Sequence, residues 1–212
     1  MHEPDDGDVF TQRYWDEKYA AQDRVWSGKP NQRLVDYAAV LPPGIALDVG
    51  CGEGADAVWL AERGWRVTGA DLSAVAIERA RTHAGEAGVA DRTTWLQHDL
   101  LGDDALPGGV DLVSAMYIHV PEDAFDRVYT RIADAVRPGG TLLVAGHHPG
   151  ERKSDLRSAA LSHLLFAPER VTAVLPKGWV VEVSDTRRRD VHNHEGQPRV
   201  AIDSVVVARR EE

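Results

Sequence analysis

The fold of this chain is decided by the stretch Leu47–Gly64, which reads LDVGCGEGADAVWLAERG. A short apolar run leads through three glycines into a segment whose apolar residues recur at helical spacing. This pattern predicts a buried strand, a tight turn and a helix that ends just before Gly64. Glycines in the turn let the backbone bend sharply and come close to a ligand. The stretch therefore predicts a ligand site where the first strand ends.

Two ligands fit this turn. Gly50, Gly52 and Ala55 match G-x-G-x-x-G/A, the fingerprint of dinucleotide-binding folds. Gly50, Gly52 and Gly54 equally match G-x-G-x-G, which, with Asp48 just ahead, is the turn used to hold S-adenosylmethionine. The first interpretation predicts an NAD-dependent oxidoreductase and the second a methyltransferase. The turn alone does not choose between them.

Size and composition predict one ordinary globular domain over residues 1–212, with 43% hydrophobic and 27% charged residues. The net charge of −10 at pH 7 disfavours a nucleic-acid partner, because affinity for phosphates comes from clustered Lys and Arg. No apolar run reaches the ~20 residues of a membrane helix. The start, MHEPDDGD, lacks the pattern of a signal peptide, and Cys51 is the only cysteine. We expect a cytoplasmic protein that is a monomer or a homodimer.

Strand-like and amphipathic segments alternate from residue 45 onward. The predicted strands lie at 45–50, 65–71, 93–100, 110–118 and 141–148, and helices are predicted at 31–41, 55–63, 73–88, 121–137 and, with a break at Pro168, 154–175. Two further β-rich runs, 179–191 and 200–210, leave no room for a helix between them and must pair antiparallel. The pattern predicts an α/β fold: a doubly wound, mostly parallel seven-stranded sheet with helices on both faces and a C-terminal antiparallel hairpin.

Acidic residues stand at the ends of two predicted strands, where ligands bind in such sheets. Asp71 ends the second strand, and its carboxylate could accept hydrogen bonds from both hydroxyls of a ribose. Alternatively, Asp71 and Ser73 could simply cap the next helix. Asp99 and Leu100 close the third strand, where an acid could bind an adenine amino group and a leucine could cover the ring.

Five segments together resemble the class I S-adenosylmethionine-dependent methyltransferases. They are LDVGCGEG at 47–54, Asp71–Leu72, QHDL at 97–100, the strand that ends at Met116, and RPGGTLLV at 137–144. Within that superfamily, the chain is similar to the small tellurite-resistance and thiopurine-type methyltransferases. This narrower resemblance rests on YWDEKY with Trp26, on FAPERV at 166–171 and on VHNHEGQPRV before the final strand.

The resemblance implies a cofactor, S-adenosylmethionine, with S-adenosylhomocysteine as its product, and a division of the chain. Residues 45–148 would form the cofactor-binding core, 1–41 an N-terminal helical lid, and 149–212 a helical segment and the hairpin. Gly50 and Gly52 would lie against the methionine part, Asp71 and Leu72 at the ribose, and Asp99 and Leu100 at adenine. The floor and lid would come from Met116, Trp15 and Trp26. Arg33 would meet the methionine carboxylate or make a surface ion pair.

The methyl acceptor is expected to be a small molecule bound beyond the fourth and fifth strands. Tyr117 and His119 follow the fourth strand, and His192 lies in the final hairpin, which the resemblance places near the acceptor. These are the candidate catalytic residues. The pair His192 and His194 is interpreted as part of a polar turn and not as a metal site, so no metal is expected.

Alternatives remain for the reaction. A thiol, selenium or tellurium nucleophile needs little beyond correct positioning, whereas a phenol, amine or heterocycle would gain from a general base. An NAD-dependent oxidoreductase stays possible from the glycine turn and Asp71, although the C-terminal hairpin would then be unexplained. A non-catalytic protein that binds S-adenosylmethionine is a third hypothesis, because no base is evident.

Overall fold

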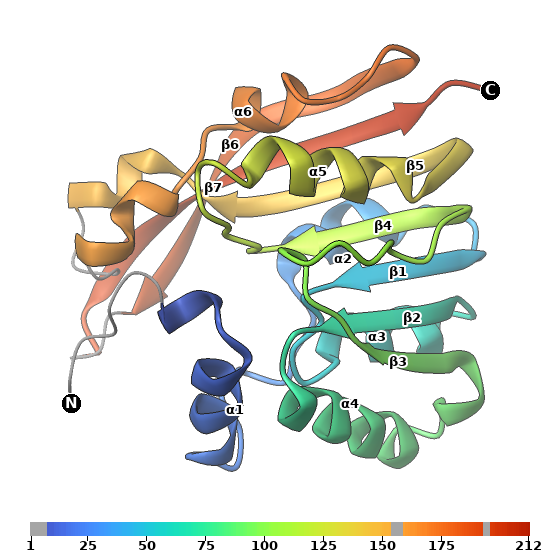
Figure 1. Cartoon of the computed structure of the whole chain (residues 1–212), viewed down its shortest axis with the longest axis vertical. Coiled ribbons are helices and arrows are strands. Elements are labelled where there is room, and N and C mark those ends of the chain that lie inside the picture. The colour runs from blue at the N-terminus through green and yellow to red at the C-terminus, as the bar shows by residue number, and fades with distance from the viewer. Residues whose placement is uncertain (1–7, 154–158, 193–195) are drawn as a thin grey trace.

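The computed structural model describes residues 8–153, 159–192 and 196–212, and these form a seven-stranded sheet (Figure 1). The strand order is β3-β2-β1-β4-β5-β7-β6, in which neighbours from β3 to β5 are parallel and β7 is antiparallel to both β5 and β6. The strands are β1 (Ile45–Val49), β2 (Arg66–Asp71), β3 (Thr93–Gln97), β4 (Val110–Met116), β5 (Val136–His147), β6 (Trp179–His192) and β7 (Pro198–Arg210). The predicted doubly wound sheet with an antiparallel hairpin is confirmed.

Helices cover both faces of the sheet. The α-helices are α1 (Gln12–Ala20), α2 (Gln32–Ala38), α3 (Ala55–Glu62), α4 (Ala74–Glu86), α5 (Phe125–Asp134) and α6 (Pro168–Thr172). Short 3-10 turns are η1 (Asp8–Phe10), η2 (Ala90–Arg92), η3 (Pro149–Lys153) and η4 (Ala159–Leu164). No helix in the described ranges is long and apolar enough to cross a membrane.

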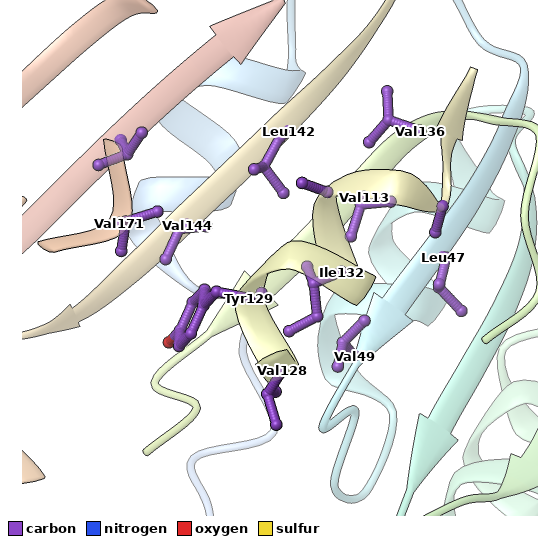
Figure 2. Packing of buried hydrophobic residues seen from close by; sticks show 14 of the residues in the cluster. Leu47, Val49, Val113, Val128, Tyr129, Ile132, Val136, Leu142, Val144 and Val171 are labelled. Atoms are coloured by element: carbon purple, nitrogen blue, oxygen red, sulfur yellow. The ribbon is translucent and has the colours of Figure 1, made fainter. Parts of the chain in front are cut away.

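The larger core lies between α5 and one face of the sheet (Figure 2). Val128 and Ile132, four residues apart on α5, face Leu47, Val49 and other strand residues. Each fully buried aliphatic side chain contributes roughly 1.5–3 kcal/mol. Because side chains alternate along a strand, the intervening residues of β1 and β4 face α2, α3 and α4, where a second core forms. Because of this alternation, Asp48 and Met116, near the ends of their strands, lie on the face of the sheet that α3 covers.

Two helix ends lie where the sequence predicts them, each at a capping residue. Ser73 caps α4, since its Oγ accepts a hydrogen bond from the backbone N–H of Ala76 at 3.1 Å. Gly64 follows α3 with φ +92°, the left-handed conformation of a helix-ending glycine. Both caps come from neighbouring residues, which is why the sequence reveals them.

Other predicted boundaries were wrong. The third strand ends at Gln97, because the Asp99 carboxylate accepts the Leu101 N–H at 2.8 Å and turns the chain. Helix α5 stops at Asp134, since Val136 already pairs with Val110 of β4. The helix expected at 154–175 is replaced by η4 and the five-residue α6, while 154–158 lie outside the described residues.

The parallel strands bring their carboxyl ends to one edge of the sheet. In Figure 1 the arrowheads of β1, β2 and β4 point toward the side on which α1 lies. Strand β4 stops at Met116, and the next residue, Tyr117, has φ 58°, which turns the chain away from the sheet. A hydrogen bond holds the segment after β4 against α5: the Tyr129 hydroxyl donates to the Ile118 carbonyl at 2.7 Å. This edge carries the site.

Candidate active site

A cavity of about 1130 Å³ opens at the carboxyl ends of the strands. Ligand pockets usually measure about 300–1,000 Å³, so this one has room for two small molecules side by side. Its walls come from the segment 9–33, the glycine turn, the ends of β2 to β5, and the residues before α6. Every residue predicted for the site lines it except His192, which is exposed at the end of β6.

The glycine turn is held tightly against β2. Gly50 and Gly52 have φ of +66° and +52°, which favour glycine. The N–H groups of Gly50 and Cys51 both donate to the Ala70 carbonyl, at 2.7 and 3.0 Å. A Cβ on Gly50 would lie only 2.0 Å from Ile118 Cδ1. Cys51 itself is a small buried residue.

Asp71 joins the turn to the next helix. Its Oδ2 accepts the Gly52 N–H at 2.8 Å, and its Oδ1 accepts the Ser73 N–H at 2.9 Å. The carboxylate that lines the cavity therefore also orders the start of α4, and its contact with a ribose stays a prediction. Burial raises the pKa of Asp71 above its ordinary value.

Further acids surround the turn. Asp48 is fully buried beneath it, and burial, followed by the nearby Asp56 and Asp71, raises its pKa well above the usual range. Its Oδ2 has no hydrogen-bond partner among the described residues. Glu53 is also buried at this place. A cationic ligand beside this buried carboxyl group would favour its charged form, whereas a phosphate would disfavour it further.

These contacts answer the question left open by the glycine pattern. A pyrophosphate on a dinucleotide turn needs unoccupied backbone N–H groups and a positive potential. Here the N–H groups of Gly50, Cys51 and Gly52 are bonded within the protein, and that of Gly54 donates to the Cys51 carbonyl at 2.9 Å. The bonded N–H groups and the acids around the turn thus favour the sulfonium and ammonium of S-adenosylmethionine over the pyrophosphate of NAD.

The N-terminal segment is fastened over the turn by two of these acids. Glu53 accepts the backbone N–H groups of Val25 and Trp26, each at 3.1 Å through Oε2. Asp56 accepts the backbone N–H and the side-chain amide of Asn31, at 2.6 and 2.8 Å. The segment between α1 and α2 is therefore bound to the start of α3, beside the cavity.

Aromatic side chains of this segment gather at the cavity. The indole N–H of Trp26 donates to the Tyr19 hydroxyl at 2.9 Å, and that of Trp15 donates to the Val9 carbonyl at 2.8 Å. The Lys18 ammonium lies 4.5 Å from the centre of the Trp15 ring and 5.1 Å from that of Trp26. The rings therefore offer a flat apolar surface at the cavity, and the Lys18 ammonium already lies over part of it.

Beyond Met116 the cavity is lined by Tyr117, His119 and His147. Among the described residues, Tyr117 is the one non-glycine with positive φ, a strained conformation for an aromatic residue and one that often marks a functional site. Its ring centre lies 4.5 Å from that of His147, and the His119 ring stacks on His147 at 5.1 Å and 9°. Burial, followed by the charge of Asp203, raises the pKa of Tyr117 to about 12.

A charge network that the sequence analysis missed lies beneath this wall. Asp203 of β7 is 0% exposed and accepts from Arg33 Nε at 3.1 Å and from Arg189 Nε at 3.0 Å. Arg33 also donates to Asp36 at 3.0 Å and to the Arg188 carbonyl at 3.3 Å. Arg33 is thus a buried residue that joins the half-buried Asp36 of its own helix to the fully buried Asp203. Arg33 also lines the cavity, and its expected contact with a methionine carboxylate stays a prediction.

His147 also faces a buried acid. Glu151 is 1% exposed, its Oε2 lies 3.8 Å from His147 Nδ1, and its Oε1 accepts the Ile202 N–H at 2.6 Å. A signal for these residues exists in the sequence. His147 ends the fifth strand, Glu151 follows it four residues later, and Asp203 interrupts an apolar run that must be a buried strand.

Three of these groups could together approach a metal ion. His147, Glu151 and Asp203 each offer one ligand atom, all within 4.8 Å of one another. However, Arg33 and Arg189 already neutralise Asp203, and a divalent cation would add two positive charges beside theirs. The expectation of a site without metal stays a prediction that this charge balance supports.

Comparison with known proteins identifies the class that this fold and site define. A family model described as a methyltransferase domain matches residues 46–140. The ubiquinone biosynthesis O-methyltransferase of Xanthomonas campestris pv. campestris (strain B100) is 31% identical over 183 residues, which cover 80% of this chain and 72% of that protein. The chain belongs to the class I S-adenosylmethionine-dependent methyltransferases.

Two solved structures share the fold. TehB from Haemophilus influenzae has a TM-score of 0.71 at 16% identity, over 94% of this chain and 67% of that one. The magnesium protoporphyrin IX methyltransferase of Synechocystis PCC 6803, solved with bound S-adenosylhomocysteine, has a TM-score of 0.62 at 19% identity, over 96% of this chain and 84% of that one. At these identities the likeness concerns the fold.

Proposed function

We propose that this enzyme binds S-adenosylmethionine along the crevice from Trp26 to Met116 and transfers its methyl group to a small hydroxylated molecule. The main support for this donor site is the glycine turn, whose N–H groups are bonded within the protein and which is surrounded by buried acids. The methionine part would lie over Gly50 and Gly52, near the orphaned oxygen of Asp48.

The remaining donor contacts follow from the lining of the cavity. Asp71 and Leu72 would hold the ribose, and Asp99 and Leu100 the adenine. When bound, S-adenosylmethionine supplies an electrophilic methyl group on a positively charged sulfur. The protein then has to hold the acceptor in line with the carbon–sulfur bond and exclude water, and such positioning can contribute roughly 7–11 kcal/mol.

The acceptor half of the cavity supports a hydroxyl as nucleophile. A soft anion would need only an open, positioned subsite, whereas this wall carries two histidines, a tyrosine and buried acids. The relative from Xanthomonas is named as an O-methyltransferase, which agrees with that chemistry. The cytoplasm stays the predicted compartment, and a monomer or a homodimer the predicted assembly.

Titration calorimetry tests the donor site. We expect S-adenosylmethionine and S-adenosylhomocysteine to bind and NADH to give no heat of binding. Methylation of phenols, thiols, selenite and tellurite is then measured with radiolabelled donor. Binding of NADH alone would overturn the proposal, and donor binding without turnover of any acceptor would favour a non-catalytic binding protein.

A further inference from the structure

The charged residues that line the cavity are divided between its two ends. Among the described residues, every acid in the lining belongs to β1, the glycine turn, α3, β2, α4 or the segment after β3, which together surround the proposed donor site. At the acceptor end the lining includes Arg33 and Arg189. The acids that contact this wall, Asp203 and Glu151, are buried and are not among the lining residues. The acceptor half therefore presents positive charge to its ligand.

Arg189 reaches the cavity from a strand at the edge of the sheet. Strand β7 lies between β5 and β6, yet no described residue of β7 lines the cavity, and Arg189 is the one described residue of β6 that does. Its side chain must therefore extend across β7. The guanidinium carbon lies 5.7 Å from the centre of the Tyr117 ring, which also lines the cavity. The part of Arg189 that reaches the cavity is thus its charged end.

The guanidinium of Arg189 retains hydrogen-bond donors for a ligand. A guanidinium carries five N–H groups. The Nε–H of Arg189 donates to Asp203, with its carboxylate oxygens at 3.1 and 3.0 Å, and the other partner among the described residues is the Tyr117 side chain. The side chain of Arg189 is 32% exposed. N–H groups on its two terminal nitrogens therefore remain available at the cavity.

The network around Arg189 has more positive than negative charge. Arg33 and Arg189 share the single buried carboxylate of Asp203. Asp36 also accepts from Arg33, but its side chain is 35% exposed, so water screens its charge. Arg189 thus has no acid of its own. A carboxylate suits such a group, because its two oxygens match the planar fork of a guanidinium.

We propose that Arg189 binds a carboxylate of the methyl acceptor, so that the acceptor is a hydroxylated organic acid. The inference rests on the proposed function and adds the class of substrate and the residue that selects it. Leu164 and Leu165 line the cavity at this end, since the next residue, Phe166, donates its backbone N–H to the His147 carbonyl at 3.2 Å. These apolar side chains suit the carbon skeleton of an organic acid, and an inorganic oxyanion would leave them without a partner.

Matched substrates test the subsite in the wild type. Hydroxybenzoates, hydroxycinnamates and their primary amides carry the same hydroxyl groups, and each pair differs in the charge of one group. We expect kcat/KM for the preferred acid, for example 3,4-dihydroxybenzoate, to exceed that for its amide by at least ~tenfold, the effect of one charge-assisted hydrogen bond. Calorimetry on the complex with S-adenosylhomocysteine should likewise show tighter binding of benzoate than of benzamide.

Substitution of Arg189 separates ligand binding from structure. Arg189→Gln should raise KM for the acid by about 10–100-fold and leave kcat within about threefold, because the lost contact is made equally in the ground state and the transition state. Turnover of the amide should change by less than ~threefold. Arg189→Lys, which keeps the charge without the planar fork, should lie between. Arg188→Gln, an exposed neighbour on the other face of β6, is the matched control.

Three outcomes would overturn the inference. They are a wild type that treats every acid and its amide alike, equal losses for acids and amides in Arg189→Gln, and a loss in that variant confined to selenite or tellurite. The second would mean that Arg189 only supports Tyr117 and Asp203, and the third that it binds an inorganic oxyanion. Failure of wild type to bind S-adenosylmethionine would instead refute the proposed function. Benzoate binding without turnover of any acceptor would refute that function and support the carboxylate subsite.

Discussion

At the scale of single residues, carboxylates that line the cavity also order the structure around it. Asp71 orders the glycine turn and the start of α4 with its two oxygens while it faces the cavity. Asp48 is buried beneath the turn with one oxygen unbonded. The sequence identified Asp71 from its position at a strand end and Asp48 from its place just ahead of the glycine turn. Their raised pKa values depend on burial, which only the folded chain determines.

Asp71→Ala should weaken S-adenosylmethionine binding by at least ~tenfold, because at least one charge-assisted hydrogen bond is lost. Trp26→Ala should weaken it less. Calorimetry on variants with wild-type circular dichroism makes the comparison, and Asp185→Ala, an exposed acid on β6, serves as control. Unchanged affinity in folded Asp71→Ala would refute the ribose contact.

Asp48→Asn should stabilise the ligand-free protein at pH 7.5, with Tm higher by ~2–4 °C, the shift that corresponds to ~1 kcal/mol in a domain of this size. The folded pKa of Asp48 lies above its ordinary value of 3.8, so the wild type loses stability as pH rises above that value. The gain of the variant should therefore shrink as pH is lowered toward 4. Donor affinity should fall in the same variant.

Asp111→Asn is the control, because folding lowers the pKa of Asp111 whereas it raises the pKa of Asp48. Although partial burial raises the pKa of Asp111, hydrogen bonds from the Ile45 N–H and from Arg137 lower it overall. Its stabilising contribution is present above the ordinary pKa and is lost in acid. Asp111→Asn should thus lower Tm at pH 7.5. Equal shifts in both variants would contradict the electrostatic explanation.

At the scale of elements, the segment between α1 and α2 is held less by its own apolar surface than by acids at the start of α3. Glu53 binds Val25 and Trp26 through their backbone N–H groups, and also Arg79 of α4 at 3.0 Å. Trp26 itself is half exposed. A segment fastened by a few polar contacts can open locally at low cost. These contacts support the prediction that it acts as a lid.

Glu53→Gln should speed amide hydrogen exchange at Val25 and Trp26 by at least ~tenfold, since the charged acceptor of both N–H groups is lost. Exchange measured by mass spectrometry, with and without S-adenosylhomocysteine, tests this. Glu78→Gln, which removes an exposed acid of α4, is the control. Equal exchange rates in the two variants would show that Glu53 does not hold the segment.

At the scale of the whole molecule, the network of Asp203, Arg33 and Arg189 joins α2, β6 and β7 across 170 residues of sequence. Removing the charge of Asp203 would leave two guanidinium groups close together without their shared acid. Losing one partner of a buried ion pair typically costs about 3–5 kcal/mol.

Asp203→Asn should lower the free energy of unfolding by roughly that amount, about 3–5 kcal/mol. Urea titration followed by fluorescence measures it, with Asp185→Asn on the exposed part of β6 as control. A loss below ~1 kcal/mol would mean that water screens the pair.

Local patterns in the sequence determined the strand and helix alternation, the glycine turn, the Ser73 cap and the acids at strand ends, because each depends on residues close together in the chain. Only the tertiary structure decided that Arg33 pairs with Asp203, that Glu151 faces His147, and that His192 stays outside the cavity. Those relations depend on β7 lying between β5 and β6. Hydrophobic periodicity shows which face of a strand is buried, and it does not encode which distant strand lies beside it.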